Sequence, residues 1–406
     1  MRFITCHKPA NRLRTPWQIT TPPCAGRVVE FGQFIAAPAA AQALADLGAD
    51  VIKVEPPGGD AARTVGWTRD AYGPMFTAYN RSKRSVVLDL RSQEGRDTAR
   101  KLGSSADVLL QNMRPGVMEK LGLGAAALMA LAPRLVYGQV SGFGQIGPAS
   151  LRPGFDIAAQ AESGMMSLNG PRDHEPTRVG FTAVDAMAGH ALTTGVLAAL
   201  LRRSSTGRGG LVEVSLIDVA VEGLINAWAE YRLTGVMPLR CGNGQPSSAP
   251  AADVIRTADG MVVVSAYTED HFRRLCAALG RSDMALDPRF SANQGRVQNR
   301  DALRAELGLA MGHLTSEALC DLLTQAGVVA GAVRTMAEVL PGHAGVSADL
   351  FVEVSAVGRD PVRIPGIPMK IDGAARPGGR LPGLGEHTAQ VLAELAADSP
   401  TVNHSN

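Results

Sequence analysis

The sequence predicts an α/β protein with a large Rossmann-like lobe on a parallel sheet and a smaller α+β lobe. In the first half of the chain, short apolar strands alternate with helical segments, a pattern typical of βαβ units. The chain has 406 residues, more than one hydrophobic core usually fills. From about Gly223 the composition changes, and residues 233–252 are rich in Gly, Pro and Ser. Together these observations predict two lobes.

The individual elements follow from the same patterns. Strands are predicted at residues 28–31, 51–55, 108–111 and 135–140, with helices at 38–47 and 91–102. In the second half, residues 254–266 predict a hairpin, and helices are predicted at 271–279, 300–311, 316–325 and 388–396. We therefore divide the chain into a flexible extension (1–24), the large lobe (25–222), the small lobe with its connections (223–340), and a return segment with a closing helix that completes the large lobe (341–406).

Composition excludes several classes of protein. The net charge is +2 without any block of like charges, so neither a nucleic acid nor an acidic membrane surface is an expected partner. Five scattered cysteines fit neither a disulfide framework nor a zinc site, and they predict a reducing cytoplasm and no metal. Residues 1–24 lack the apolar segment of a secretory signal. We expect a flexible extension there, with a presequence or a misplaced start codon as alternatives.

Residues 142–147 have the G-x-G-x-x-G spacing of a dinucleotide site and follow a predicted strand. In such a site the glycines open a long helix whose N-terminus holds the pyrophosphate. Pro148 and Pro153 follow here and prevent an immediate long helix. The sequence therefore does not predict a nicotinamide cofactor.

Asp185 is the most informative residue. It stands where a polar loop meets residues 186–201, a run of small and apolar residues that predicts a buried helix. One interpretation is a helix cap, a position that favours Asp. The other is a nucleophile, a carboxylate that the helix dipole keeps ionised and that attacks an acyl carbon. The surrounding sequence has to decide between them.

Several segments carry a resemblance to a known family in the family's order. They are residues 28–31 and 37–38, Leu-Gly-Ala-Asp-Val-Ile-Lys-Val-Glu-Pro-Pro-Gly-Gly-Asp at 47–60, Asn-Arg-Ser-Lys-Arg-Ser at 80–85, Asn-Met-Arg-Pro-Gly at 112–116, Ser-Gly-Phe-Gly-Gln-Ile-Gly-Pro at 141–148 and Leu-Gly-Glu-His-Thr at 384–388. With these segments the chain resembles the family III CoA-transferases, a group that includes formyl-CoA transferase, carnitine CoA-transferase and the α-methylacyl-CoA racemases. The resemblance runs from near Arg27 to about Leu395.

The resemblance implies that Asp185 is the acyl-accepting nucleophile, because the family's aspartate precedes a segment that begins here at Gly195. It gives Asp156 a part in arranging the site, whereas the interpretation from the residues alone is an Asp that caps a turn. The racemase branch has a histidine where Phe155 stands, and phenylalanine cannot exchange a proton. We therefore expect a transferase, with a racemase as the alternative and a non-catalytic CoA-binding protein as the second alternative.

The resemblance also implies which residues meet CoA, expected as a thioester substrate and not as a tightly bound cofactor. By position these residues are Arg63, Lys83, Asn112, Lys120 and Ala36. The family commonly has a glutamine for the oxyanion hole where Ile35 stands here, and Gln33 is offset from it by two. Backbone amides of Ala36 or Ala37 are the expected substitute. Pro56 stands where formyl-CoA transferase has its adenine-stacking arginine, so the adenine pocket differs.

Further expectations concern substrates and assembly. Succinyl-CoA or another short dicarboxylyl-CoA is the expected donor, with Arg69, Arg81 or Arg240 meeting the distal carboxylate. His190 is expected to be a packed core histidine. The resemblance implies a homodimer of two interlocked open rings, in which residues 233–252 and 333–352 connect the lobes. The identities of both acids are not predicted by the sequence.

Overall fold

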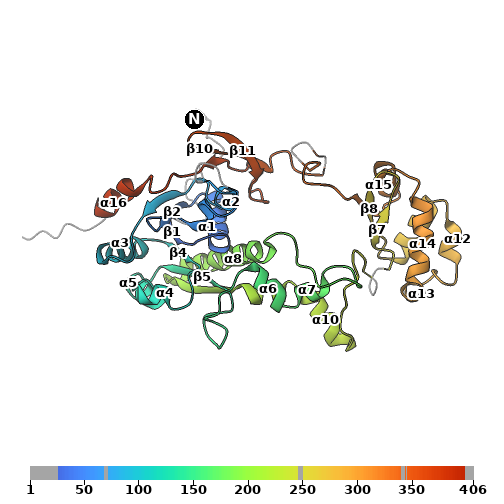
Figure 1. Cartoon of the computed structure of the whole chain (residues 1–406), viewed down its shortest axis with the longest axis horizontal. Coiled ribbons are helices and arrows are strands. Elements are labelled where there is room, and N and C mark those ends of the chain that lie inside the picture. Colours follow the sequence, from blue (N-terminus) through green and yellow to red (C-terminus); the bar gives the residue numbers. More distant parts are fainter. Residues whose placement is uncertain (1–25, 68–71, 246–249, 340–342, 344, 398–406) are drawn as a thin grey trace, which may run out of the picture. The chain divides into compact units, whose positions relative to one another are not determined.

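The computed structural model describes residues 26–67, 72–245, 250–339, 343 and 345–397, so the predicted extension lies outside the described residues. The chain forms two compact units (Figure 1). The first comprises the described parts of Met1–Ser163, Phe181–Gly223 and Ser347–Asn406, and the second comprises those of Gly164–Gly180 and Leu224–Val346. The segment Gly164–Gly180 thus belongs to the second unit, although the sequence placed it in the large lobe.

The first unit is built on a sheet of six strands in the order β3-β2-β1-β4-β5-β6, and every pairing in it is parallel. The prediction of a parallel α/β sheet is confirmed. The strands are β1 (Arg27–Phe31), β2 (Asp50–Glu55), β3 (Arg84–Val87), β4 (Val108–Gln111), β5 (Val136–Ser141) and β6 (Gly210–Ser215). Four of them were predicted, whereas β3 and β6 were not.

Helices cover both faces of this sheet, as expected for a doubly wound fold. On one face, α1 (Ala36–Asp46) and the long α8 (Ala183–Thr206) pack against each other and against the strands. On the other face, α3 (Gln93–Ser104), α5 (Ala125–Leu131) and α16 (Thr388–Ala397) share a hydrophobic core with the strands (Figure 1). The C-terminal helix therefore completes the core of the first unit.

The strand order reverses between β1 and β4, so the sheet has a topological switch point there. In open α/β sheets, ligands bind outside the carboxyl ends of the strands at such a point. Phe31 and Gln111 are the last residues of β1 and β4, and they pair in register. The residues that follow them, Gly32 to Phe34 and Asn112 to Arg114, are therefore placed where a ligand is expected.

A second sheet of the first unit was not predicted. Its strands are β10 (Phe351–Ala356), β11 (Arg359–Pro365) and β12 (Gly379–Arg380), in the order β11-β10-β12. Val352 and Val354 of β10 pack with Phe76 of α2 (Pro74–Tyr79). This cluster supports α2, which contributes Tyr79 to the surroundings of the site described below.

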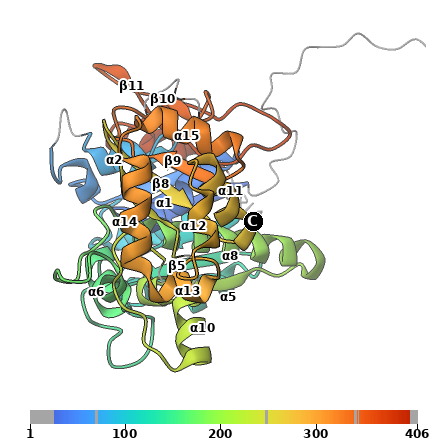
Figure 2. The same ribbon diagram turned by 90° about the vertical axis from the view of Figure 1, so that its right-hand side faces the viewer.

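The second unit has a separate core around the sheet β7-β8-β9. β7 (Asp253–Arg256) and β8 (Met261–Ser265) form the predicted antiparallel hairpin, and β9 (Val329–Ala332) pairs with β8. Figure 2 shows the helices α11 (Glu269–Ala278), α12 (Ser282–Leu286), α13 (Asn293–Gln298), α14 (Arg300–Met311) and α15 (Ser316–Gln325) of this unit. The predicted helices of the small lobe are confirmed as α11, α14 and α15.

Helix α8 passes a length and hydropathy test for a membrane span. It packs against α1, β5 and β6, and Val184, Leu192 and Val196 are fully buried. Because a core helix meets the same test, these contacts are the relevant observation. We describe α8 as the central helix on one face of the sheet.

Candidate active site

Asp185 lies in the first turn of α8, as the third residue of the helix. Thr182 occupies the cap position and forms no side-chain hydrogen bond with the helix. The helix-cap interpretation of Asp185 is therefore wrong, because the carboxylate stands inside the first turn and caps none of its own N–H groups. Its carboxylate is left for another role.

The cap of α8 comes from Asp156, the first residue of α6 (Asp156–Glu162). One carboxylate oxygen of Asp156 accepts hydrogen bonds from the backbone N–H groups of Val184, at 2.7 Å, and Asp185, at 3.2 Å. The other accepts from the amide of Gln160 at 2.6 Å. Asp156 is buried. It caps a helix distant in sequence, not the turn of its own loop, and it fixes where Asp185 stands.

Burial, and after it the charge of Asp156, raise the pKa of Asp185 to about 7. The sequence-based expectation was that the helix dipole would keep Asp185 ionised. In the structure, desolvation and a neighbouring carboxylate outweigh the dipole, because both disfavour the charged form. Asp185 is consequently a carboxyl group poised between its two protonation states near neutral pH.

Close packing of α1 on α8 brings the start of α1 against the second turn of α8, which follows Asp185. A Cβ at Gly189, one turn after Asp185, would lie 2.8 Å from Cβ of Ala39 and 3.2 Å from the carbonyl oxygen of Ala36. Only glycine permits this approach. Ala36 is the first residue of α1 and is 3% exposed, whereas Ala37 is completely buried. Of the two expected backbone donors, Ala36 alone retains accessible surface.

Tyr79, the last residue of α2, also borders Asp185. Burial raises the pKa of the Tyr79 hydroxyl, and the charge of Asp185 raises it further. Sequence reasoning missed this residue, because it stands next to the Asn-Arg-Ser-Lys-Arg-Ser segment without belonging to it. Its proximity to Asp185 arises only from the packing of α2, α1 and α8.

A cavity of about 300 Å³ opens at the switch point of the sheet. Its walls come from the carboxyl ends of β1, β4 and β5 and from the loop before α6: Gln33, Phe34, Asn112, Met113, Arg114, Pro115, Ser141, Gly142, Ser150, Arg152, Pro153, Gly154 and Phe155. The rings of Phe34 and Phe155 meet edge to face, with centroids 5.9 Å apart. Phe155 directly precedes Asp156, so this wall of the cavity leads into α6, whereas Asp156 and Asp185 are not among the lining residues.

Of the residues expected to meet CoA, Asn112 lines this cavity, and its amide is engaged with Gln33. It accepts from the N–H of Gln33 at 2.9 Å and donates to its carbonyl at 2.8 Å. Lys120 ends α4 (Val117–Lys120) and is exposed. Arg114 and Arg152 are exposed cations on the cavity wall, and the sequence prediction missed both. Each stands in a segment quoted for the resemblance or next to one, which was the available signal.

The structure corrects the expectation for Lys83 and Arg63, which are buried. The ammonium group of Lys83 binds Glu30 at 2.7 Å, Asn80 at 3.0 Å and the carbonyl of Pro38 at 3.0 Å. The guanidinium of Arg63 holds both carboxylate oxygens of Glu55. A buried cation that is surrounded by protein partners is not accessible to the phosphate groups of CoA. Lys83 thereby links β1 to α1, and Arg63 links β2 to the carbonyl of Pro382.

Four further residues do not meet the expectations for them or fall elsewhere. His190 is exposed, so it is not a packed core histidine. Arg81 is buried and bound to Asp46, which removes it as a partner for a distal carboxylate. Arg240 belongs to the second unit, and Arg69 lies outside the described residues.

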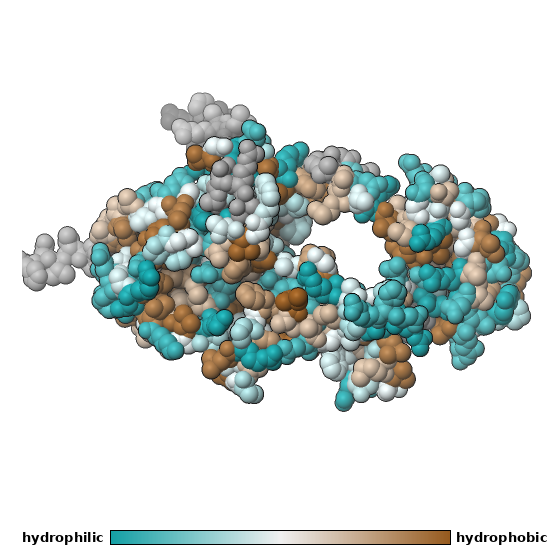
Figure 3. Space-filling model, in the orientation of Figure 1, coloured by the Kyte–Doolittle hydropathy of each residue, from teal (hydrophilic) through white to brown (hydrophobic). Residues whose placement is uncertain are grey.

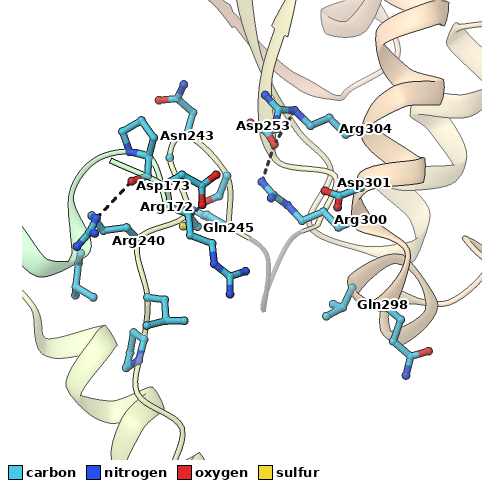
Figure 4. A pocket seen from close by; sticks show the side chains of 18 of the residues that line it. Arg172, Asp173, Arg240, Asn243, Gln245, Asp253, Gln298, Arg300, Asp301 and Arg304 are labelled. Atoms are coloured by element: carbon cyan, nitrogen blue, oxygen red, sulfur yellow. Dashed lines mark hydrogen bonds and ion pairs between the residues drawn. The ribbon is translucent and has the colours of Figure 1, made fainter. Parts of the chain in front are cut away.

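The second unit contains a larger cavity, of about 1460 Å³ (Figure 4). Three of its arginines have protein partners: Arg240 donates to the carbonyls of Ser167, Pro171 and His174, and Asp253 binds Arg300 and Arg304. Acidic residues alternate with the basic ones along the wall, so the charges largely offset each other. Among the described residues, no three His, Cys, Asp or Glu side chains gather where they could hold a metal ion.

Comparison with known proteins shows the family of the chain. Residues 26–388 match the family model of CoA-transferase family III. The chain is 38% identical to a probable fatty acyl-CoA transferase of Mycobacterium tuberculosis, over 81% of this chain and 86% of the relative. It is 36% identical to the acetyl-CoA:oxalate CoA-transferase of Acetobacter aceti, over 91% and 95%. A succinyl-CoA:mesaconate CoA-transferase of Haloarcula hispanica is 35% identical, over 92% and 96%.

The fold has solved counterparts. The crystal structure of a CaiB/BaiF family protein from Brucella suis matches with a TM-score of 0.79 and 34% identity, over 92% of this chain and 99% of that one. A doubly wound lobe together with these matches defines a CoA-transferase. The chain belongs to CoA-transferase family III.

Proposed function

We propose that this enzyme moves CoA from an acyl-CoA to a free carboxylic acid through covalent intermediates on Asp185. The observation that carries the proposal is the placement of Asp185. Its backbone N–H is held by the carboxylate of Asp156, α1 packs against Gly189 one turn later in the same helix, and Phe155, which precedes Asp156, lines a cavity at the switch point of the sheet. A nucleophile, a cleft for the substrate arm and a nearby backbone donor are what acyl transfer requires.

In the proposed first half-reaction, a carboxylate oxygen of Asp185 attacks the thioester carbonyl. The C–S bond breaks, CoA leaves as the thiolate and a mixed anhydride remains. The thiolate then attacks the Asp185 carbonyl carbon, which releases the donor acid and leaves an aspartyl-CoA thioester. The acceptor carboxylate attacks this thioester to form a second anhydride, and the thiolate finally attacks the acceptor's acyl carbon. The products are a new acyl-CoA and the free Asp185 carboxylate.

The surroundings of Asp185 favour the first step. Burial and the charge of Asp156 destabilise its ionised form. Forming the anhydride removes that charge, so the attack relieves both unfavourable effects. The oxyanion of each tetrahedral intermediate needs a donor, and Ile35 offers none from its side chain. We assign that role to the backbone N–H of Ala36, the first residue of α1.

We assign the cavity at the switch point to the pantetheine and diphosphate part of CoA. Phe34, Met113 and Phe155 give it apolar walls, Arg114 supplies an exposed guanidinium group, and Arg152, also exposed, is paired with the exposed Glu162. Arginine suits phosphate groups because its planar fork donates two parallel hydrogen bonds. Lys120 is exposed and remains a candidate contact for the nucleotide end.

The identity of both acids is open to experiment. The named relatives act on fatty acyl, oxalyl and dicarboxylyl groups, so their names do not choose between charged and uncharged acyl groups. A succinyl-type donor remains a prediction, and it has lost Arg81 as a partner. A racemase is disfavoured because Phe155 offers no titratable group.

We also propose that the enzyme works as a homodimer. Helix α10 (Ile225–Thr234) and the segment after it expose large apolar side chains, among them Trp228, Leu233 and Met237. Hydrophobic side chains are visible at the surface over α10 in Figure 3. An exposed apolar patch of this kind marks an interaction surface. Interlocking of the two rings and the cytoplasmic location remain predictions.

The experiment that tests the proposed activity is CoA exchange followed by mass spectrometry. The pure protein is incubated with a panel of acyl-CoAs and free acids, and with a 2-methylacyl-CoA in heavy water. We expect new acyl-CoAs to appear with at least one donor and acceptor pair, without α-deuterium above the uncatalysed level. Rapid deuterium incorporation without CoA transfer would instead identify a racemase.

A further inference from the structure

The turn between β1 and α1, residues 32–34, is fixed by side chains from three other segments. Lys53 of β2 donates to the carbonyl of Gly32 at 2.9 Å. Asn112 binds both the N–H and the carbonyl of Gln33. Asp60 accepts from the N–H of Phe34 at 3.3 Å. Each of these three residues is therefore held through hydrogen bonds between side chains and its backbone groups.

Phe34 has a backbone conformation that phenylalanine rarely adopts. Its φ angle is +61°, in the left-handed region where a side chain is strained. Such strain persists only where the surroundings over-determine the conformation, and it is concentrated at functional sites. The hydrogen bonds that the turn forms with Lys53, Asn112 and Asp60 fix this conformation. Lys53 and Asp60 are also paired with each other at 2.8 Å, and both are buried.

The turn reaches the catalytic acids by two routes. Through the chain, it sets where α1 begins, and Ala36 packs against Gly189 one turn after Asp185. Through space, the Phe34 ring meets the Phe155 ring, and Phe155 directly precedes Asp156. A relaxed turn would therefore move both the start of α1 and the loop that carries Asp156.

We propose that Asn112 is a positioning residue of the reaction and not a ligand of CoA: its amide clamps the strained turn so that Ala36 and Phe155 stay in place around Asp185 and Asp156. Each polar atom of the amide forms one hydrogen bond with Gln33, which fixes the orientation of the amide and leaves one N–H and one lone pair. This inference rests on the proposed function, because it assumes chemistry at Asp185.

The test compares Asn112→Ala with Asn169→Ala. Asn169 lies in the second unit, and its amide also holds a backbone carbonyl, that of Thr177 at 2.8 Å, so it is a matched control. For Asn112→Ala we expect kcat for CoA transfer to fall about tenfold or more, since small misplacements of reacting groups are costly. We expect the Kd of free CoA, measured by calorimetry, to change less than about threefold, and Asn169→Ala to leave both quantities near wild type.

Phe34→Gly completes a double-mutant cycle. Glycine adopts a positive φ without strain, so the clamp has less to hold and the effect of Asn112→Ala should shrink in the Phe34→Gly background. The cycle is measured on kcat and on the stability to denaturant. Additive effects would overturn the proposal. So would an Asn112→Ala variant that binds CoA tenfold or more weakly with kcat unchanged, because Asn112 would then be a CoA ligand.

The two proposals can fail separately. A wild-type protein that exchanges no CoA would refute the proposed function. The stability cycle of Asn112→Ala and Phe34→Gly would still decide whether the amide clamps the turn. Coupling in stability together with an unaffected kcat would show a clamp that has no part in catalysis, which also overturns the positioning role.

Discussion

Asp185 links protein stability to pH in an unusual direction for a carboxylate. Its pKa is raised from 3.8 to about 7, so the folded state prefers the protonated form. This preference contributes fully to the free energy of unfolding below about pH 4, and the contribution is lost as the pH rises towards 7. Asn at this position cannot ionise and avoids that loss.

We therefore expect Asp185→Asn to be more stable than wild type at about pH 8, by about 1–4 kcal/mol. The difference should shrink towards zero near pH 4. Denaturant unfolding across this pH range measures it. A variant that is less stable than wild type at high pH would show that Asp185 is not destabilised by ionisation.

Asp156 should tune the reactivity of Asp185 through its charge. Asp156→Asn keeps an oxygen that can accept from the N–H groups of Val184 and Asp185, but it removes the second largest cause of the raised pKa. We expect the rising limb of kcat/KM against pH to move to lower pH, with burial keeping it above the ordinary range of Asp. An unmoved limb would mean that Asp156 acts on Asp185 only as a helix cap.

At the scale of single residues, the sequence predicted both acids and failed on the buried cations. The resemblance singled out Asp185 by its position before Gly195 and Asp156 by its position after the segment 141–148. Lys83 and Arg63 were expected at the surface, where such residues usually lie. Their partners Glu30 and Glu55 come from neighbouring strands, so only the assembled sheet reveals the pairs. The same holds for Tyr79, which approaches Asp185 through packing alone.

At the scale of elements, the contact of α1 with α8 depends on Gly189. In Gly189→Ala the new Cβ would lie 2.8 Å from Ala39, so the helices must separate or shift. We expect a loss of about 1–3 kcal/mol in stability, typical of overpacking, and a loss of activity because α1 borders Asp185. Gly308→Ala in α14 is the control. A Cβ there meets nothing within 4 Å, so it should stabilise by up to about 1 kcal/mol.

The two strands that were not predicted show the limit of prediction from local sequence patterns. β3 offers only two apolar residues after a polar segment, and its place is set by pairing with β2. β6 contains Glu213, which interrupts the apolar run and accepts a hydrogen bond from Gln139 on β5 at 2.9 Å. The predicted strands β1 and β2 also contain charged residues, Glu30 and Lys53, but adjacent apolar residues, Val28-Val29 and Val51-Ile52, indicated their burial. A strand that is placed by parallel pairing with a strand distant in sequence need not show such a pattern in its own residues.

At the scale of the whole molecule, the dimer is the main open prediction. Two interlocked rings cannot separate without local unfolding, so their exchange should be far slower than that of ordinary dimers. We expect tagged and untagged preparations to form no mixed dimers over days in native buffer, and sedimentation to show no monomer on dilution. Mixed dimers within hours would show two rings that are not linked.

The most direct test of the central claim follows oxygen atoms through Asp185. In the proposed sequence the acceptor carboxylate attacks aspartyl-CoA, and one of its oxygens bridges the second anhydride. When the thiolate attacks the acceptor's acyl carbon, that oxygen stays on Asp185. An acceptor acid labelled with heavy oxygen should therefore leave one heavy atom on the peptide that contains Asp185 after a single turnover, as measured by mass spectrometry. Transfer of CoA without label in that peptide would contradict covalent catalysis by Asp185.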